Sequence, residues 1–110
     1  MKEIKAIVRP ARMNELRRLL LGLPDFPGMT VTSCRGVTAP ALKSGTSFRE
    51  ELVDYSDKVC LLIVAEDAQV NAIVEVIRRT ATTGRLGDGV LWVTALEHWE
   101  RLAPPVGRGS

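Results

Sequence analysis

The chain has 110 residues, which is the usual length of one domain. Apolar residues make up 45% and charged residues 25% of it, which excludes an intrinsically disordered chain, and a net charge of +2 excludes the one-sided basic composition of a nucleic-acid binder. No apolar run approaches the roughly 18 residues that span a bilayer, and the first ten residues alternate, unlike a signal peptide. We therefore expect one cytoplasmic domain over residues 1–110, with no nucleic-acid binding and no membrane insertion.

The first part of the chain predicts a strand, a helix and a second strand. Residues 2–9 alternate apolar and charged side chains until Pro10, which ends a strand. From Met13, leucines at positions 16, 20 and 23 recur at helical spacing, and Gly22 and Pro24 end that pattern. After a turn at residues 25–28, the β-branched residues of 29–36 predict a strand.

The segment after the second strand predicts a long loop over residues 37–57. It contains Pro40, Gly45 and several hydroxyl side chains, shows no sustained period and is far longer than a hairpin loop. We expect this loop to be mobile until a target binds to it. The tail, residues 104–110, has no apolar stripe and predicts a flexible end.

The second half predicts a strand, a helix, a glycine-rich turn and a last strand. Residues 58–65 (KVCLLIVA) are apolar on both faces, as in a central strand. A helix follows from residues 66 and 67, and residues 82–89 (TTGRLGDG) form a turn before a strand at 90–94. The expected buried stripe of the helix is Val70, Ile73, Val74, Ile77 and Ala81.

This order of elements predicts an α+β domain of ferredoxin-like type, βαββαβ, with two helices on one face of a four-stranded antiparallel sheet. The opposite sheet face also carries apolar residues. Since a small domain commonly buries such a face by oligomerising, we expect an oligomer.

The residue types argue against catalysis and against a metal site. His98 is the only histidine, and no serine, cysteine or carboxylate stands beside it in a catalytic pattern. The segment TGRLGDG at residues 83–89 combines three glycines with an arginine, so its backbone amides could approach an anion. The same glycines also suit a simple turn, and the motif alone leaves both readings open.

Two cysteines complete the inventory of reactive groups. If strands two and three pair as a hairpin, Cys34 and Cys60 could lie nearly opposite each other, at disulfide distance. A cytoplasmic protein keeps its thiols reduced, so we expect two free, buried cysteines.

Four segments together resemble the PII signal-transduction family: MKEIKAIVRP at the start, GMTVTSCRG at residues 28–36, Asp54 followed by Lys58-Val59, and RTATTGRLGDG at residues 79–89. The resemblance covers about residues 1–102, with one residue gained before Gly28 and one lost in the long loop. Its most specific part is TGRLGDG followed by a strand. It implies a divergent PII-like trimer that binds an adenine nucleotide (ADP, AMP or ATP) between neighbouring subunits, with no permanently bound cofactor.

The resemblance also implies roles for particular residues. Thr30 and Val64 would line the adenine pocket, and Gly87, Asp88 and Gly89 would surround the phosphates and ribose. Arg101 would reach the phosphates from the neighbouring subunit, and Lys58 would face the last phosphate or a small anion. Gly36 and Thr38 complete the implied nucleotide site. The long loop would contact a target protein, such as a membrane transporter or a metabolic enzyme.

Several departures from the family pattern bear on the ligand. The usual Arg-Gln pair is absent from residues 36–41 (GVTAPA), which argues against 2-oxoglutarate. Val90 and Ala103 stand where the family has cations, so ADP or AMP should bind better than ATP. Glu51 aligns with the tyrosine that receives a nucleotidyl group, which argues against that modification. Some relatives respond to other small effectors, bicarbonate among them.

Two other classes of function compete with a nucleotide sensor. The first is a trimeric ferredoxin-like structural or metal-tolerance protein that binds no nucleotide, because a fold does not determine a function. A small enzyme is the second, and the scattered acids and bases disfavour it. Adenylate binding separates the sensor from the first alternative.

Overall fold

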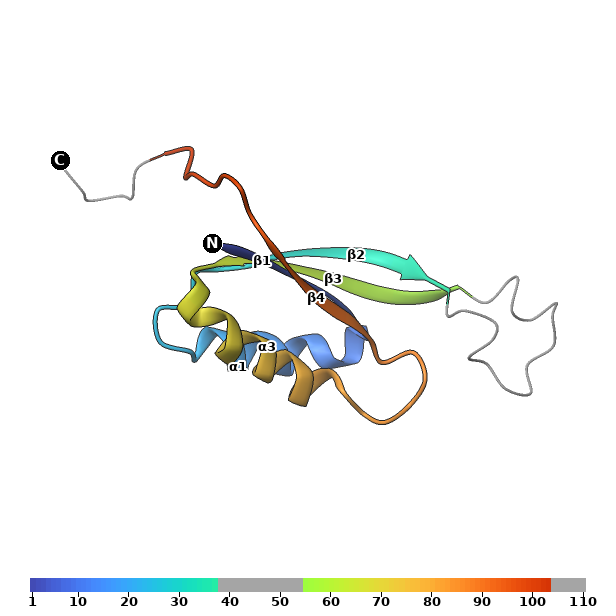
Figure 1. Cartoon of the computed structure of the whole chain (residues 1–110). Coiled ribbons are helices and arrows are strands. Elements are labelled where there is room, and N and C mark those ends of the chain that lie inside the picture. The colour runs from blue at the N-terminus through green and yellow to red at the C-terminus, as the bar shows by residue number, and fades with distance from the viewer. Residues whose placement is uncertain (38–54, 104–110) are drawn as a thin grey trace.

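The computed structural model describes residues 1–37 and 55–103, and within them four strands and two α-helices alternate as expected (Figure 1). The elements in chain order are β1 (Lys2–Val8), a 3-10 turn η1 (Pro10–Arg12), α1 (Met13–Leu21), β2 (Thr30–Gly36), β3 (Ser56–Ala65), α3 (Asp67–Ala81) and β4 (Gly89–Ala95). The strands pair antiparallel in the order β2-β3-β1-β4. The predicted ferredoxin-like fold is confirmed.

Local sequence explains where the elements begin and end. Pro10 lacks the N–H that a continuing strand would need, and it starts the turn η1 instead. Gly22 caps the end of α1. Glu66 and Gln69 form a capping box at the start of α3, in which the Gln69 side chain accepts a hydrogen bond from the Glu66 backbone N–H at 3.2 Å. These signals lie within a few residues of the ends that they define.

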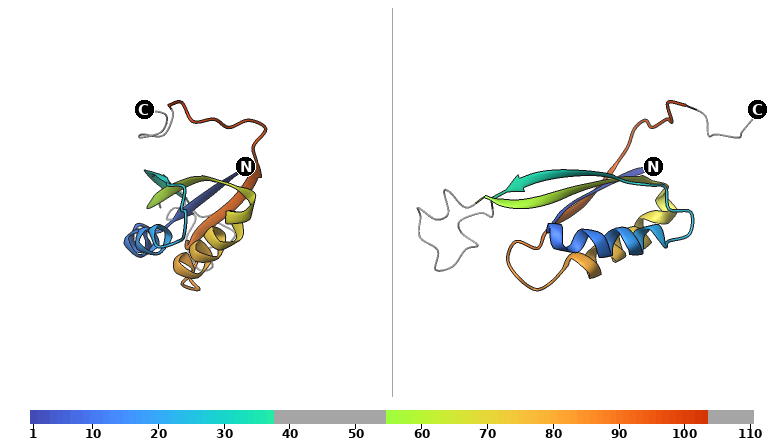
Figure 2. Two further views of the ribbon diagram at one scale, coloured as in Figure 1. Left: turned by 90° about the vertical axis from the view of Figure 1, so that its left-hand side faces the viewer. Right: turned by 180° about the vertical axis from the view of Figure 1, so that it is seen from behind.

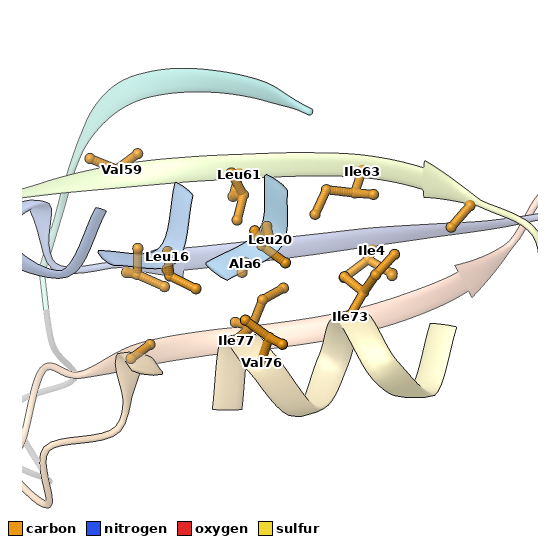
Figure 3. Close-up of a cluster of buried hydrophobic side chains, with 13 residues drawn as sticks. Ile4, Ala6, Leu16, Leu20, Val59, Leu61, Ile63, Ile73, Val76 and Ile77 are labelled. Carbon is orange, nitrogen blue, oxygen red and sulfur yellow. The ribbon is translucent and has the colours of Figure 1, made fainter. Parts of the chain in front are cut away.

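The core lies between the helices and one face of the sheet, as Figure 3 shows. Its side chains come from β1, β3, α1 and α3 and are all aliphatic: Ile4, Ala6, Val8, Leu16, Leu20, Val59, Leu61, Ile63, Ala65, Ile73, Val76, Ile77 and Ala81. The expected stripe of α3 is partly wrong. Val76 and Thr80 are buried in it, whereas Val70 and Val74 are only half-buried.

The other face of the sheet has no helix over it in the described part of the chain. The end-on view in Figure 2 shows α1 and α3 together on one side. The strand register places Lys5, Ile7, Leu62, Val90 and Trp92 on the opposite side, and we call this the open face. Val90 is 57% and Trp92 40% exposed there. β3 is central in the sheet, as predicted, but a single chain covers only one of its faces.

The two cysteines also lie on the open face, and the expectation about them needs correction. Cys34 pairs with Lys58, and Cys60 pairs with Thr32, so the cysteines are offset diagonally by two residues. Both are free, and both are half-buried where we expected them to be buried.

The remaining differences concern ends of elements and residues outside the described ranges. β3 begins two residues earlier than predicted, and β4 extends one residue further at each end. The predicted mobile loop lies outside the described residues except for its ends, and so do Thr38 and the tail 104–110. No helix in residues 1–37 and 55–103 is long and apolar enough to cross a membrane.

Candidate functional site

The glycine-rich segment between α3 and β4 is held together by one carboxylate. Asp88 accepts hydrogen bonds from the backbone N–H groups of Thr83 at 2.7 Å, Gly84 at 2.9 Å and Arg85 at 3.3 Å. The Thr83 hydroxyl also donates to it. The bonds from Thr83, followed by the ion pair with Arg9, hold the pKa of Asp88 well below its usual value. The carboxylate is therefore ionised, and it organises the turn.

Two cations fasten this turn to the sheet. Arg9, just after β1, forms an ion pair with Asp88 at 3.2 Å and donates to the carbonyl of Leu86. Lys58 Nζ on β3 donates to the carbonyl of Gly87. Gly87 has φ +86°, and a Cβ added there would lie 3.3 Å from Arg9 Nη2 and 3.5 Å from Lys58 Nζ. The turn thus brings two positive groups to the backbone of Gly87.

A cavity of about 510 Å³ opens beside this turn, and we call it the loop cavity. Its lining combines the open face with the turn and consists of Ile7, Gly36, Val37, Lys58, Arg85, Leu86, Gly87, Asp88, Gly89 and Val90. The backbone amides and the cations suit an anionic group. Val90 presents an apolar side chain where the resemblance expects a cation.

A second cavity of about 670 Å³ lies near the other end of β3, and we call it the tryptophan cavity. It is bounded by the α1–β2 connection, the end of β3 and the chain after β4: Met1, Asp25, Pro27, Gly28, Met29, Thr30, Leu62, Val64, Ala65, Glu66, Gln69, Trp99 and Arg101. The Arg101 guanidinium lies over the Trp99 ring, 5.6 Å from its centroid. The indole and the aliphatic groups suit an aromatic ligand, and Arg101 offers a cation to a negative group in a lining that also holds the carboxylates of Asp25 and Glu66.

The expected site residues fall into two groups within one chain. Gly36, Lys58, Gly87, Asp88 and Gly89 line the loop cavity. Thr30, Val64 and Arg101 line the tryptophan cavity. Thr38 lies outside the described residues.

The distance between the two groups follows from the strand that joins them. Lys58 and Val64 are six residues apart on β3, about 20 Å at roughly 3.3 Å per residue. Both belong to the open face, because the register pairs Lys58 with Cys34 and Val64 with Glu3. One chain therefore carries the two groups of expected site residues apart from each other on the open face.

Sequence reasoning missed two residues, Arg9, which holds the glycine-rich turn, and Trp99, which lines the tryptophan cavity. Arg9 was expected only at the end of a strand, yet it contacts Asp88, 79 positions away. Trp99 drew no interpretation, although it lies two residues before Arg101. A signal was available for Trp99, since a large aromatic beside an arginine near a predicted site often lines it. None was available for Arg9, because its partner depends on the pairing of β1 with β4.

The fold and the turn define a ferredoxin-like domain whose glycine-rich loop joins its second helix to its last strand. The family model described as "Nitrogen regulatory protein P-II" matches residues 1–104, and the chain belongs to this family of signalling proteins. The resemblance stated from the sequence motifs is confirmed.

Curated relatives agree with the family model. The chain is 36% identical over 106 residues to the nitrogen regulatory protein P-II of Porphyra purpurea, and 37% identical over 105 residues to the proteins of that name from Rhodospirillum rubrum and Pasteurella multocida. Each comparison covers 93% of this chain and 91% of the relative. The similarity therefore extends over nearly the whole length of both proteins.

Proposed function

We propose that this protein is a cytoplasmic adenylate sensor that works as a homotrimer. In the trimer, the loop cavity of one subunit and the tryptophan cavity of its neighbour would form one nucleotide site. The observation that carries this proposal is the division of the expected ligand-binding residues between two cavities on the open face. Packing of open faces against one another would bury the exposed Trp92 and Val90 and would complete each site.

The chemistry of the two cavities supports an adenine nucleotide with few phosphates. The amides of Gly87 and Gly89, with Lys58, would receive the phosphates, while Thr30 and Val64 would contact the base. Val90 supplies no cation to the loop cavity. A charge-assisted hydrogen bond contributes roughly 1.5–3 kcal/mol, so each lost contact lowers affinity by about tenfold or more. ADP or AMP should therefore bind more tightly than ATP.

The regulatory output would pass through the segment 37–57, which joins the loop cavity to residues outside the described ranges. Gly36, Val37 and Lys58 line that cavity at the two roots of the segment. A ligand there would contact both roots, and so could change the affinity of the segment for a target protein. The same position would admit a small anion such as bicarbonate beside Lys58. In this proposal the protein binds and regulates, and it catalyses no reaction.

Calorimetric titration tests the proposal directly. AMP, ADP, ATP and cyclic AMP are each added to the purified chain, with and without 2-oxoglutarate or bicarbonate. We expect ADP or AMP to bind most tightly and 2-oxoglutarate to have no effect. Arg101→Ala should weaken every phosphate-bearing ligand by about tenfold. Arg17→Ala is the matched control, because Arg17 is exposed on α1 and lines neither cavity.

The mass in solution, measured by sedimentation velocity, separates the alternatives. A trimer that binds adenylates supports the proposal. A trimer that binds none at millimolar concentration would favour the structural or metal-tolerance protein. A monomer that binds ADP as tightly as the trimer would contradict the shared site, because one chain holds the two groups of expected site residues about 20 Å apart.

A further inference from the structure

Trp99 has an unusual environment for a large aromatic side chain. It lies after β4, in the segment that Figure 1 shows leaving the sheet, and it is 42% exposed. Its ring lines the tryptophan cavity together with Thr30, Val64 and Arg101. The Arg101 guanidinium lies over the ring, 5.6 Å from its centroid.

This arrangement prepares the indole for a flat ligand. A guanidinium over one face of the ring restricts how the ring can turn. Because the ring lines the cavity, a planar group that enters the cavity can lie against it. Indole and purine rings attract each other by stacking, and this attraction needs no charge on the ligand.

We propose that Trp99 is a specificity-determining residue that stacks on the base of the bound nucleotide. This inference rests on the proposed adenylate function and deepens it. The loop cavity lacks a cation at position 90, so a stacked base would supply part of the affinity that phosphate contacts do not. The site should therefore depend more on the base than on the number of phosphates.

The fluorescence of Trp99 can report this contact when Trp99 is the only tryptophan in the chain. The chain has two tryptophans, so Trp92→Phe leaves Trp99 as the only indole. Addition of ADP to this variant should change Trp99 emission along a saturable curve, with the midpoint that calorimetry finds for the same variant. Unchanged emission at saturating ADP would overturn the proposal.

Two substitutions then measure the contribution of the ring. Trp99→Leu should weaken ADP binding by about tenfold, which lies within the range for loss of one stacked base. Trp99→Phe, which keeps an aromatic face, should retain most of the affinity. Equal losses in both variants, or no loss in either, would overturn the proposal. Sedimentation of each variant is required as well, because a loss accompanied by dissociation of the oligomer would assign Trp99 to subunit packing.

A double-mutant cycle distinguishes two roles for Trp99: stacking on the base, or holding Arg101 in place. If Trp99 contacts the base, Trp99→Leu should weaken ADP binding further in the Arg101→Ala protein, and the two losses should multiply. If Trp99 only holds Arg101 in place, the double variant would bind as weakly as Arg101→Ala alone, and the stacking role would be refuted. Wild-type protein that binds no adenylate would refute the proposed function itself, a result distinct from both of these.

Discussion

Gly89→Ala allows a sharp prediction, because the structure leaves no space for one added carbon. Gly89 begins β4 opposite Val8 with φ +118°. A Cβ added there would lie 1.8 Å from the carbonyl oxygen of Ile7 and 2.9 Å from its carbonyl carbon. Since ordinary contact begins at 3.4 Å, β1 and β4 would have to separate by about 1.6 Å at this point.

The cost of that separation can be worked out from its parts. The displaced strand would lose backbone hydrogen bonds worth about 1 kcal/mol each. An alanine at positive φ adds about 1–2 kcal/mol. We expect the free energy of unfolding to fall by about 3 kcal/mol or more. For a domain of about 100 residues, this corresponds to a decrease in Tm of about 12 °C or more.

Gly84→Ala is the matched control in the same turn. Gly84 also has a positive φ, +83°, but a Cβ added there meets nothing within 4 Å. It should lose only the roughly 1–2 kcal/mol that the backbone conformation costs. Thermal unfolding of both variants and wild type, followed by circular dichroism at one protein concentration, makes the comparison. Equal Tm values for the two variants would show that β4 relaxes freely and that the steric argument is wrong.

Three further predictions concern charge, packing and the ligand. Because the pKa of Asp88 is lowered in the folded protein, its carboxylate stabilises the fold fully above about pH 4 and loses this contribution as the pH falls toward the folded pKa. The Tm difference between wild type and Asp88→Asn should therefore be largest near neutral pH and shrink on acidification. A Tm difference that grows in acid would contradict this sign. Leu20→Ala should lower the free energy of unfolding by about 2–5 kcal/mol in urea titrations, whereas Leu21→Ala, 54% exposed on the same helix, should change it by less than about 0.5 kcal/mol. Val90→Lys places a cation in the loop cavity and should raise the affinity for ATP relative to ADP by about tenfold in calorimetry, and an unchanged ratio would mean that the phosphates do not reach position 90.

Short-range signals predicted most of the elements. Pro10 ended β1, Leu16 and Leu20 of α1 were buried at helical spacing, and the apolar run of residues 58–65 formed the central strand. These signals act within one or two turns of chain, since backbone conformation and side-chain periodicity are local properties. The errors in α3 arose where burial depends on a neighbour. Thr80 is polar and still buried, and its backbone carbonyl accepts a hydrogen bond at 2.8 Å from Arg12 Nε.

The motif TGRLGDG identified the family, and the comparisons agree with it over almost the whole chain. The motif alone did not predict which contacts its residues make within the fold. Asp88, expected at a nucleotide, uses both carboxylate oxygens to hold its own turn. That arrangement needs Arg9, which the pairing of β1 with β4 brings to the turn. A motif names residue types in order and carries no information on a partner 79 positions away.

The amino-acid sequence was enough to predict the type and order of the elements, the family, and the residues expected at the ligand. Tertiary structure alone decided the strand register, and with it the faces of the sheet. The register put Lys58 and Val64 on the face of the sheet that no helix covers, and it displaced Cys34 from Cys60 by two residues. The physical reason is that strand pairing joins segments far apart in the chain, and a one-residue shift would move every side chain to the other face.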